Sequence, residues 1–314
     1  MTDSERFDLA ASVLPKGIAD AFLSMDTVSK SRIREIRLRT GKPLVAVTEN
    51  GAEFVSSGGR LTRVYSALIM KTDEAAVKET FKKICGYSVH SFKDAINKGY
   101  VTLSGGHRAG VAGTAVTENG GVTSVRDISC INLRIAREIK GAADDIIRND
   151  FSGGLRSLIV AGPPASGKTT VLRDLARQLS GEAFGFAKVF VCDERGEIGA
   201  SFSGIPQNDI GINCDLITAY PKGEGIMIGL RSFSPDIIIC DEIATSAEID
   251  AVESGINSGI CFVLSVHARN EAELKTKPII RRLLTGGGFG RVVLLSGTNV
   301  GKTEKRFGAG DLIA

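Results

Sequence analysis

Short apolar runs alternate with helical patterns in the second half of the chain. Strand candidates lie at 157–161, 188–192, 237–240, 261–266 and 291–295. Alternation of this kind is typical of a parallel α/β sheet. We therefore predict an α/β domain over residues 151–314.

The first half has a different pattern. Residues 10–25 have a helical pattern, whereas the apolar positions of 33–39 fit neither helical nor strand spacing and are interpreted as a short helix that passes into a strand. Two short apolar runs, 44–47 and 52–55, flank Glu49-Asn50-Gly51. Because this tripeptide is a turn signal, the segment is predicted to form a β-hairpin.

A helix is predicted over 72–85, with Thr72 as its N-cap. From 100 to 125, apolar runs alternate with glycines, which is typical of antiparallel strands joined by tight turns. Ser152-Gly153-Gly154 has the composition of a linker. We therefore predict a smaller α+β domain over residues 1–150.

Composition agrees with two globular domains, because 314 residues exceed one typical domain and 43% of them are hydrophobic. No apolar run approaches the roughly 20 residues of a membrane span, and the first residues lack a secretory signal, so a cytoplasmic location is expected. The six cysteines show no C-x-x-C spacing, which indicates neither a disulfide framework nor a zinc site. The net charge of +3 does not indicate a nucleic-acid binder.

A phosphate-binding motif opens the second domain. Residues 162–169 fit G-x-x-x-x-G-K-[ST], with an apolar strand before the motif and an amphipathic helical face after it. Backbone amides of such a loop surround phosphate oxygens, Lys168 would reach the β and γ phosphates, and Thr169 would coordinate Mg²⁺. The residues expected to contact ATP are Gly162, Pro163, Pro164, Ala165, Ser166, Gly167, Lys168, Thr169 and Thr170.

A second Gly-Lys-Thr occurs at 301–303, but Ser296 stands in place of the first glycine. Only a short tail without helical periodicity, 304–314, follows it. We interpret this segment as a solvated tail rather than a second phosphate loop.

Two adjacent carboxylates follow the strand candidate 237–240. Asp241 and Glu242 would lie at its carboxyl end, where ligands collect in open α/β sheets. Asp241 is predicted to hold Mg²⁺ through water, and Glu242 to orient or deprotonate the attacking water. The alternative is that both carboxylates cap the next helix.

Other strand ends supply further catalytic candidates. Glu194 and Glu197 follow the strand at 188–192 and are alternative general bases, although both could be solvated loop acids. His267 follows the strand at 261–266 and could sense the γ phosphate, or it could be structural. Arginines before the phosphate loop could act on a neighbouring subunit's nucleotide or form ordinary ion pairs: Arg108, Arg126, Arg134 and Arg137.

The order of these motifs resembles that of the secretion-superfamily ATPases. The phosphate loop, Asp193-Glu194, the run ending at Asp241-Glu242, and Val266-His267-Ala268 follow one another as Walker A, Asp-box, Walker B and His-box do there. Within that superfamily, segments 34–43 and 105–113 resemble the stage III sporulation AA family. Ala165 and Ala268 depart from the pattern, because glycine is expected at both positions.

The resemblance implies a RecA-like P-loop NTPase domain preceded by the smaller α+β domain. It also implies an ATP- and Mg²⁺-dependent motor, assembled as a homo-oligomer, with a hexamer expected. Its partners would be membrane-embedded subunits of a sporulation channel between mother cell and forespore. The protein would then lie peripherally at the membrane through these partners, without direct contact to nucleic acid.

Three other functions are weighed against this one. A nucleic-acid-stimulated ATPase could use the same fold, but the chain lacks a basic groove interleaved with aromatics. An ATP-gated assembly scaffold would not need Asp241-Glu242. A small-molecule kinase would be expected to have an Arg-rich lid after the paired carboxylates, and the chain has no obvious one.

Overall fold

The computed structural model describes residues 2–97, 99–118 and 120–313. The chain divides into two compact units, each described here by itself. The N-terminal unit contains the residues up to Arg137 and the segment Phe202–Gln207, and the P-loop unit contains Glu138–Ser201 and the residues from Asn208 onward.

The division differs from a boundary at residue 150. Helix α6 (Asp144–Asp150) belongs to the P-loop unit, because Ile146 and Phe151 are buried in the same cluster as Leu158 of that unit's sheet. Residues 202–207 return to the N-terminal unit, which local sequence pattern could not indicate.

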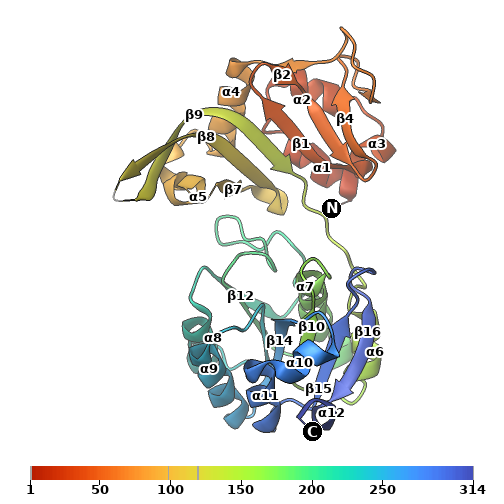
Figure 1. The fold of residues 1–314 in the computed structure, drawn as a ribbon, viewed down its shortest axis with the longest axis vertical. Helices are drawn as coiled ribbons and strands as arrows, with labels where there is room; N and C mark the ends of the chain where they lie inside the picture. The colour runs from red at the N-terminus through yellow and green to blue at the C-terminus, as the bar shows by residue number, and fades with distance from the viewer. Residues whose placement is uncertain (1, 98, 119, 314) are drawn as a thin grey trace. The chain divides into compact units, whose positions relative to one another are not determined.

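An antiparallel sheet of seven strands forms the N-terminal unit, in the order β5-β4-β3-β1-β9-β8-β7. The strands are β1 (Ile33–Arg39), β3 (Val45–Thr48), β4 (Gly51–Val55), β5 (Leu61–Thr62), β7 (Tyr100–Thr102), β8 (Arg108–Glu118) and β9 (Gly121–Arg134). A small second sheet pairs β2 (Lys42–Pro43) with β6 (Lys71–Thr72). The helices are α1 (Asp3–Ala11), α2 (Lys16–Leu23), α3 (Thr27–Arg32), α4 (Glu74–Ile84) and α5 (Lys93–Asn97), shown in Figure 1.

Several predictions for this unit are confirmed and others are wrong. The hairpin and the antiparallel strands after residue 100 are confirmed. The opening helix is two helices, because Pro15 lacks an amide hydrogen and begins α2 as its N-cap. The segment 33–39 is a strand throughout, and Asp73 rather than Thr72 caps α4, its carboxylate accepting from the Ala76 amide at 2.7 Å.

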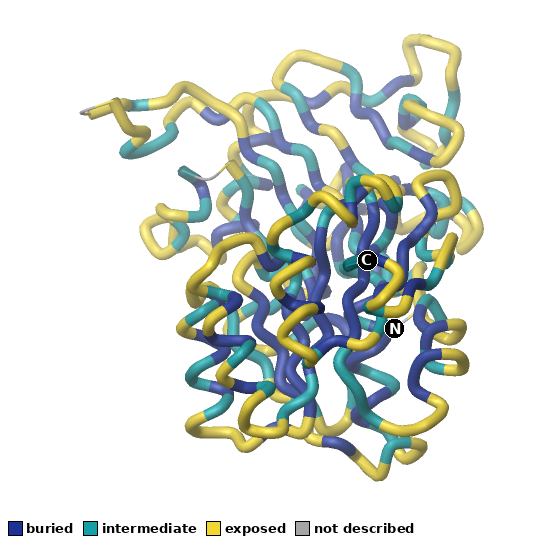
Figure 2. The backbone as a smooth tube through the Cα atoms, turned by 60° about the horizontal axis from the view of Figure 1, so that its bottom comes forward, coloured by how far each residue is buried: buried dark blue, intermediate teal, exposed yellow. Residues whose placement is uncertain are grey.

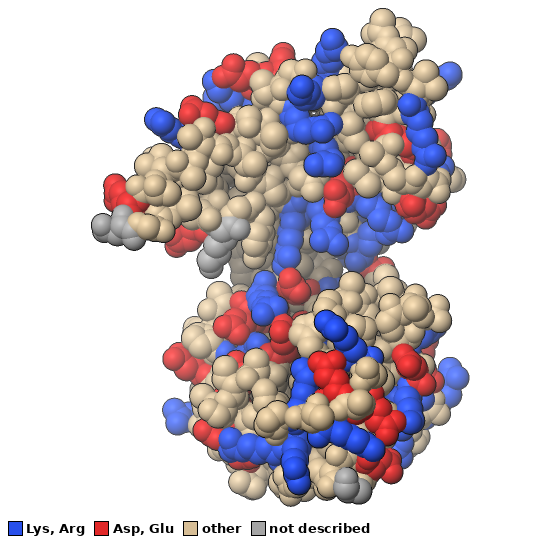
Figure 3. All heavy atoms as spheres, in the orientation of Figure 1, with Lys and Arg blue, Asp and Glu red and all other residues tan. Residues whose placement is uncertain are grey.

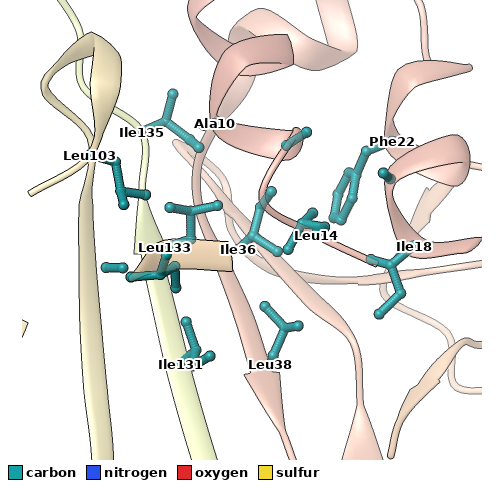
Figure 4. Close-up of a cluster of buried hydrophobic side chains, with 14 of the residues drawn as sticks. Ala10, Leu14, Ile18, Phe22, Ile36, Leu38, Leu103, Ile131, Leu133 and Ile135 are labelled. Carbon is teal, nitrogen blue, oxygen red and sulfur yellow. The ribbon is translucent and has the colours of Figure 1, made fainter. Parts of the chain in front are cut away.

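The core of this unit lies between the sheet and its helices (Figure 4). Four strand residues that are at most 1% exposed belong to it: Ile36 and Leu38 of β1, and Ile131 and Leu133 of β9. These residues meet apolar side chains from α1 and α2. The cluster includes Ala10, Leu14, Ile18, Phe22, Ile36, Leu38, Leu103, Ile131, Leu133 and Ile135.

The P-loop unit is built on a second sheet of seven strands, in the order β12-β11-β13-β14-β10-β15-β16. The strands are β10 (Leu158–Gly162), β11 (Val189–Asp193), β12 (Cys214–Thr218), β13 (Ile237–Cys240), β14 (Cys261–His267), β15 (Arg291–Leu295) and β16 (Thr303–Gly308). All are parallel except β16, which runs antiparallel to β15. The five predicted strands are confirmed, whereas β12 and β16 were not predicted.

Helices cover both faces of this sheet. Leu158 and Val160 of β10 are buried with α7, while Ile159 and Ala161 are buried with α8 and α9, so alternate residues serve opposite layers. Figure 2 shows the buried positions concentrated along the strands. The helices are α6, α7 (Lys168–Leu179), α8 (Lys222–Ser232), α9 (Ser246–Asn257), α10 (Glu271–Thr276), α11 (Pro278–Thr285) and α12 (Ala309–Ile313).

Strand order brings the motifs together. Strand β14 lies between β10 and β13, and the register places His267 opposite Gly162. The phosphate loop, His267 and the two carboxylates therefore share the carboxyl edge of the sheet, where open α/β folds bind ligands. Across the described ranges, none of the helices has the length and apolar character to span a bilayer.

Candidate nucleotide-binding and catalytic site

The loop between β10 and α7 has the backbone that a phosphate cradle needs. Gly167 is left-handed with φ of 91°, and Ala165 adopts φ of 61°, at a cost of about 1–2 kcal/mol for a residue with a Cβ. A Cβ on Gly162 would lie 2.4 Å from the Ser166 hydroxyl oxygen, so a larger residue there would displace the Ser166 side chain. The predicted strand–loop–helix context is confirmed.

Unsatisfied polar groups of this loop fit an anion. Gly167 begins α7 without a side-chain cap, and within the described residues the amides of Lys168 and Thr169 have no acceptor. The hydroxyl of Ser166 is buried and likewise has no partner there. Free amides and the positive end of a 12-residue helix together form a binding site for phosphate.

Lys168 is buried at the centre of the site. Its ammonium donates to the carbonyls of Gly162 and Pro163 at 2.9 Å each, and to His267 Nδ1 at 3.1 Å. Burial lowers the pKa of Lys168, although Asp241 and Glu242 oppose this shift. The carboxylates of Asp241 and Glu242 act on this buried lysine only at a distance. A bound phosphate would supply an anionic partner in direct contact with its ammonium.

Thr169 and Asp241 form the candidate Mg²⁺ site. The Thr169 hydroxyl donates to Asp241 Oδ2 at 2.8 Å. Ser265 donates its own hydroxyl to Asp241 Oδ1 and accepts the Glu242 amide at 2.8 Å. A hydroxyl beside a carboxylate is an oxygen donor set of the kind that Mg²⁺ binds together with waters and phosphate oxygens, so these residues fit the ion.

Glu242 is held in a strained backbone conformation directly after the strand, with φ of 49°. Its carbonyl accepts from the Lys222 ammonium at 2.5 Å. Its carboxylate lies 2.6 Å from an Arg195 nitrogen and 3.4 Å from His267 Nε2. Because His267 Nδ1 accepts from Lys168, the neutral ring carries its hydrogen on Nε2 and points it toward Glu242.

A pocket of about 270 Å³ opens beside this carboxylate. Its lining includes Glu242, Val266, His267, Lys277 and Pro278. Two of the catalytic candidates, Glu242 and His267, therefore border a space that water can enter.

The two acids after β11 are placed differently. Glu194 lies 3.4 Å from the Lys222 ammonium, so it shares one lysine with Glu242. Glu197 is held through its backbone, with its amide donating to Asp193 and its carbonyl accepting from Arg173 at 2.6 Å. Burial raises the pKa of Asp193, although three backbone amides, including that of Glu197, oppose this shift.

The second Gly-Lys-Thr packs against the phosphate loop. The Gly301 amide donates to the Ser166 carbonyl at 2.8 Å, and a Cβ on Gly167 would lie 2.8 Å from the Gly301 nitrogen. The prediction of a solvated tail is wrong, because residues 303–308 pair with β15 and bury Phe307. The pattern gave no signal because β16 is an edge strand in which three consecutive charged residues, 304–306, precede the single buried apolar residue Phe307.

Three residues of the site were not predicted. Ser265, Arg195 and Lys222 contact Asp241 or Glu242 although each lies on a different element. The Asp-Glu-Arg sequence after β11 was the only signal for Arg195. Ser265 and Lys222 depend on sheet register and on the position of α8, which the sequence pattern does not give.

The arginines considered for action on a neighbouring subunit belong to the N-terminal unit. Arg108 lies over the Tyr100 ring at 4.9 Å, and Arg126 lies 3.5 Å from Asp127. Arg137 donates to the Ile33 carbonyl at 2.8 Å and pairs with Asp3. Their action on another subunit stays a prediction.

Related sequences share most of the chain. The sequence profile of the family described as "Sporulation stage III, protein AA" matches residues 7–306. Stage III sporulation protein AA of Bacillus subtilis (strain 168) is 33% identical over 288 residues, which cover 91% of this chain and 90% of the relative. The uncharacterized protein ycf45 of Porphyra purpurea is 30% identical over 190 residues, which cover 59% of this chain and 32% of the relative.

Solved structures share the fold. The pilus retraction motor PilT with bound ADP matches with a TM-score of 0.54 at 15% identity, over 83% of this chain and 74% of that one. The ATPase DotB of Yersinia pseudotuberculosis matches with a TM-score of 0.53 at 13% identity, over 83% of this chain and 70% of that one. At such identities the likeness shows the fold alone, and it confirms the predicted α/β, RecA-like P-loop class.

Proposed function

The chain belongs to the stage III sporulation protein AA family, and we propose that it is a Mg²⁺-dependent ATP hydrolase acting as a motor of a secretion-like sporulation channel. The observation that carries the proposal is the junction of two motifs 72 residues apart, where the Thr169 hydroxyl meets Asp241. Lys168, Glu242 and His267 lie in contact around the same point.

The phosphate groups would be held by the loop that joins β10 to α7. Free amides at the start of α7 and the Lys168 ammonium point to a polyanion such as the triphosphate of ATP. Thr169 and Asp241 would hold Mg²⁺, which supplies charge neutralisation on the phosphates when it is bound. Residues 162–170 are the proposed nucleotide contacts.

Glu242 is the proposed general base or water-orienting group. Its carboxylate borders an open pocket and is fixed from two sides by Arg195 and His267. Glu194 contacts Lys222, the lysine that also contacts Glu242, and would modulate the Glu242 carboxylate through it. Glu197 is a secondary candidate on the neighbouring loop. His267 contacts both Lys168 and Glu242, so it would transmit a change at the phosphates to the base.

Assembly and partners are proposed from family membership. We propose a homo-oligomer, with six subunits expected, in which nucleotide binds between subunits. Membrane-embedded subunits of the channel between mother cell and forespore would hold the protein peripherally at the membrane from the cytoplasmic side. No direct role for nucleic acid is proposed.

Measuring ATP binding by two lysine variants tests which of the two Gly-Lys-Thr sequences holds the phosphates. Lys168→Ala is expected to abolish ATP binding and hydrolysis, because it removes the buried cation of the cradle. Lys302→Ala is the matched control, because it alters an exposed lysine in the same tripeptide and is expected to leave binding and turnover near wild type. Equal loss in both variants, or in neither, would overturn the assignment of the phosphate loop.

A further inference from the structure

One loop of the N-terminal unit exposes a cluster of large apolar side chains. Between β5 and β6, Val64 is 73% exposed, Tyr65 57% and Leu68 69%. Single exposed apolar residues are ordinary on a protein surface, but three within five positions form a contiguous apolar tip. In Figure 1 this loop is the orange segment that projects beyond β4.

The loop is anchored, so the exposed side chains are held outward. The Tyr65 ring packs edge-on against Phe54, with centroids 5.6 Å apart. The Ser57 amide donates to the Leu68 carbonyl at 3.0 Å, and the Ile69 side chain directly after it is buried. These contacts attach the loop to β4 and to the segment that precedes β5.

Charge around the tip has one sign. Residues 54–72 contain Arg60, Arg63 and Lys71 and no aspartate or glutamate. Arg60 and Arg63 are exposed, and Arg63 donates to the Asn50 carbonyl, a neutral acceptor that leaves the guanidinium charge in place. In Figure 3 this end of the unit is a projection of uncharged residues with basic side chains beside it.

The neighbouring acids are engaged elsewhere. Glu49 lies 3.7 Å from Arg32 and 3.9 Å from Arg34, and Glu53 accepts from the Thr48 hydroxyl at 3.0 Å. Glu49 is therefore paired with arginines, while the charged residues of the loop itself, Arg60, Arg63 and Lys71, are all basic.

We propose that the loop 60–71 binds directly to the surface of an anionic lipid bilayer. Val64 and Leu68 enter the boundary between headgroups and acyl chains, and Tyr65 lies at headgroup level, where its ring and hydroxyl are both accommodated. Arg60 and Arg63 contact lipid phosphates. A tip that carries both apolar and basic side chains fits the surface of an anionic bilayer, which offers acyl chains to the former and phosphates to the latter.

This inference goes beyond membrane association through partner proteins, and it does not depend on ATP hydrolysis. It is tested by sedimentation of the full chain with phosphatidylcholine vesicles, with and without phosphatidylglycerol, in the absence of nucleotide. The wild type is expected to bind only the anionic vesicles, and the binding is expected to weaken as salt is raised.

Variants separate the apolar and basic contributions. Val64→Ser with Leu68→Ser is expected to lower the partition coefficient about tenfold or more, because two apolar side chains no longer leave water. Arg60→Gln with Arg63→Gln is expected to remove the preference for anionic vesicles. Val28→Ser is the matched control, because Val28 is 67% exposed on α3 of the same unit, and its binding is expected to equal that of the wild type.

Three results would overturn the proposal. Wild-type protein that ignores anionic vesicles contradicts it directly. Unchanged binding by the Val64→Ser, Leu68→Ser variant would place the lipid contact elsewhere. The loop would be assigned to a protein interface if the wild type does not bind vesicles but captures a purified membrane-protein partner, and if the Val64→Ser, Leu68→Ser variant no longer captures that partner.

Discussion

The Thr169 hydroxyl oxygen lies 2.8 Å from Asp241 Oδ2; Thr169 stands in the first turn of α7, which follows β10, and Asp241 comes directly after β13. Strand β14 lies between those strands and contributes Ser265, which holds the other carboxylate oxygen. Three strands must therefore keep their register for the candidate metal site to exist. Substitutions at this junction should therefore impair Mg²⁺-dependent hydrolysis more than they destabilise the fold.

Asp241→Asn is predicted to weaken the dependence on Mg²⁺ while leaving the fold intact. The amide keeps the hydrogen bonds to Thr169 and Ser265 in part, but it removes the charge that attracts the cation. The Mg²⁺ concentration for half-maximal hydrolysis should rise by about tenfold to a hundredfold. Asp215→Asn, on an exposed position of β12, should not change it, and chelation of Mg²⁺ should stop turnover by the wild type.

Arg195→Gln is predicted to lower kcat with little change in KM for ATP. Arg195 acts as a positioning residue, because among the described residues its contact is with the Glu242 carboxylate, at 2.6 Å. Displacement of that carboxylate should cost about tenfold to a hundredfold in kcat. Arg195→Lys should recover part of the lost kcat. Arg231→Gln, which alters an exposed residue of α8, should leave kcat unchanged. A KM effect without a kcat effect would contradict this role.

Gly167→Ala is predicted to destabilise the protein more than Gly185→Ala. Both glycines are left-handed, with φ of 91° and 63°, so both substitutions carry a backbone cost of about 1–2 kcal/mol. Only at Gly167 would the new Cβ meet backbone, 2.8 Å from the Gly301 nitrogen, which adds about 1 kcal/mol or more. Denaturant unfolding of both variants measures the difference, and equal losses would show that the 296–302 loop does not press on the phosphate loop.

Acid is predicted to destabilise the N-terminal unit through His107. Burial, assisted by the charge of Arg6, lowers the pKa of His107 from 6.5 to about 4. The unfolded chain therefore binds a proton below pH 6.5 that the folded chain refuses, so stability is complete above pH 6.5 and falls as pH drops toward 4. The loss should reach about 3 kcal/mol.

His107→Gln should flatten this part of the stability profile, measured by denaturant unfolding between pH 4 and 7. His90→Gln is the control, because His90 is exposed. A slope that persists in His107→Gln would show that another group titrates there.

The site residues that could be predicted from sequence are those whose role depends on a short continuous segment of the chain. The phosphate loop and Asp241-Glu242 each occupy one short segment after an apolar strand, so pattern alone placed them at a sheet edge. Ser265 could not be found this way, because its role comes from the pairing of β13 with β14 and not from its neighbours along the chain.

The misjudged elements have physical causes. Strand β1 carries charged residues between its apolar ones, and its pairing with β3 and β9 decides its conformation against a mixed local pattern. Strand β16 contains consecutive charged residues because Lys305 and Arg306 form ion pairs with acids of neighbouring helices, so the strand lacks an alternating apolar pattern. The segment 202–207 joins the N-terminal unit through tertiary contacts, one of which is the Gln207 side chain accepting from the Gly105 amide at 2.7 Å.

The central claim is that this chain hydrolyses ATP with Glu242 as its base or water-orienting group, and the most direct measurement is turnover against protein concentration with mass determined in parallel. Turnover should rise as the protein assembles. Glu242→Gln should bind ATP as tightly as wild type yet hydrolyse it at least about a hundredfold more slowly. The matched variant Glu253→Gln, altered in a surface ion pair, should behave as wild type. Assembled wild-type protein that binds ATP without turnover, or a Glu242→Gln variant that turns over normally, would contradict the account.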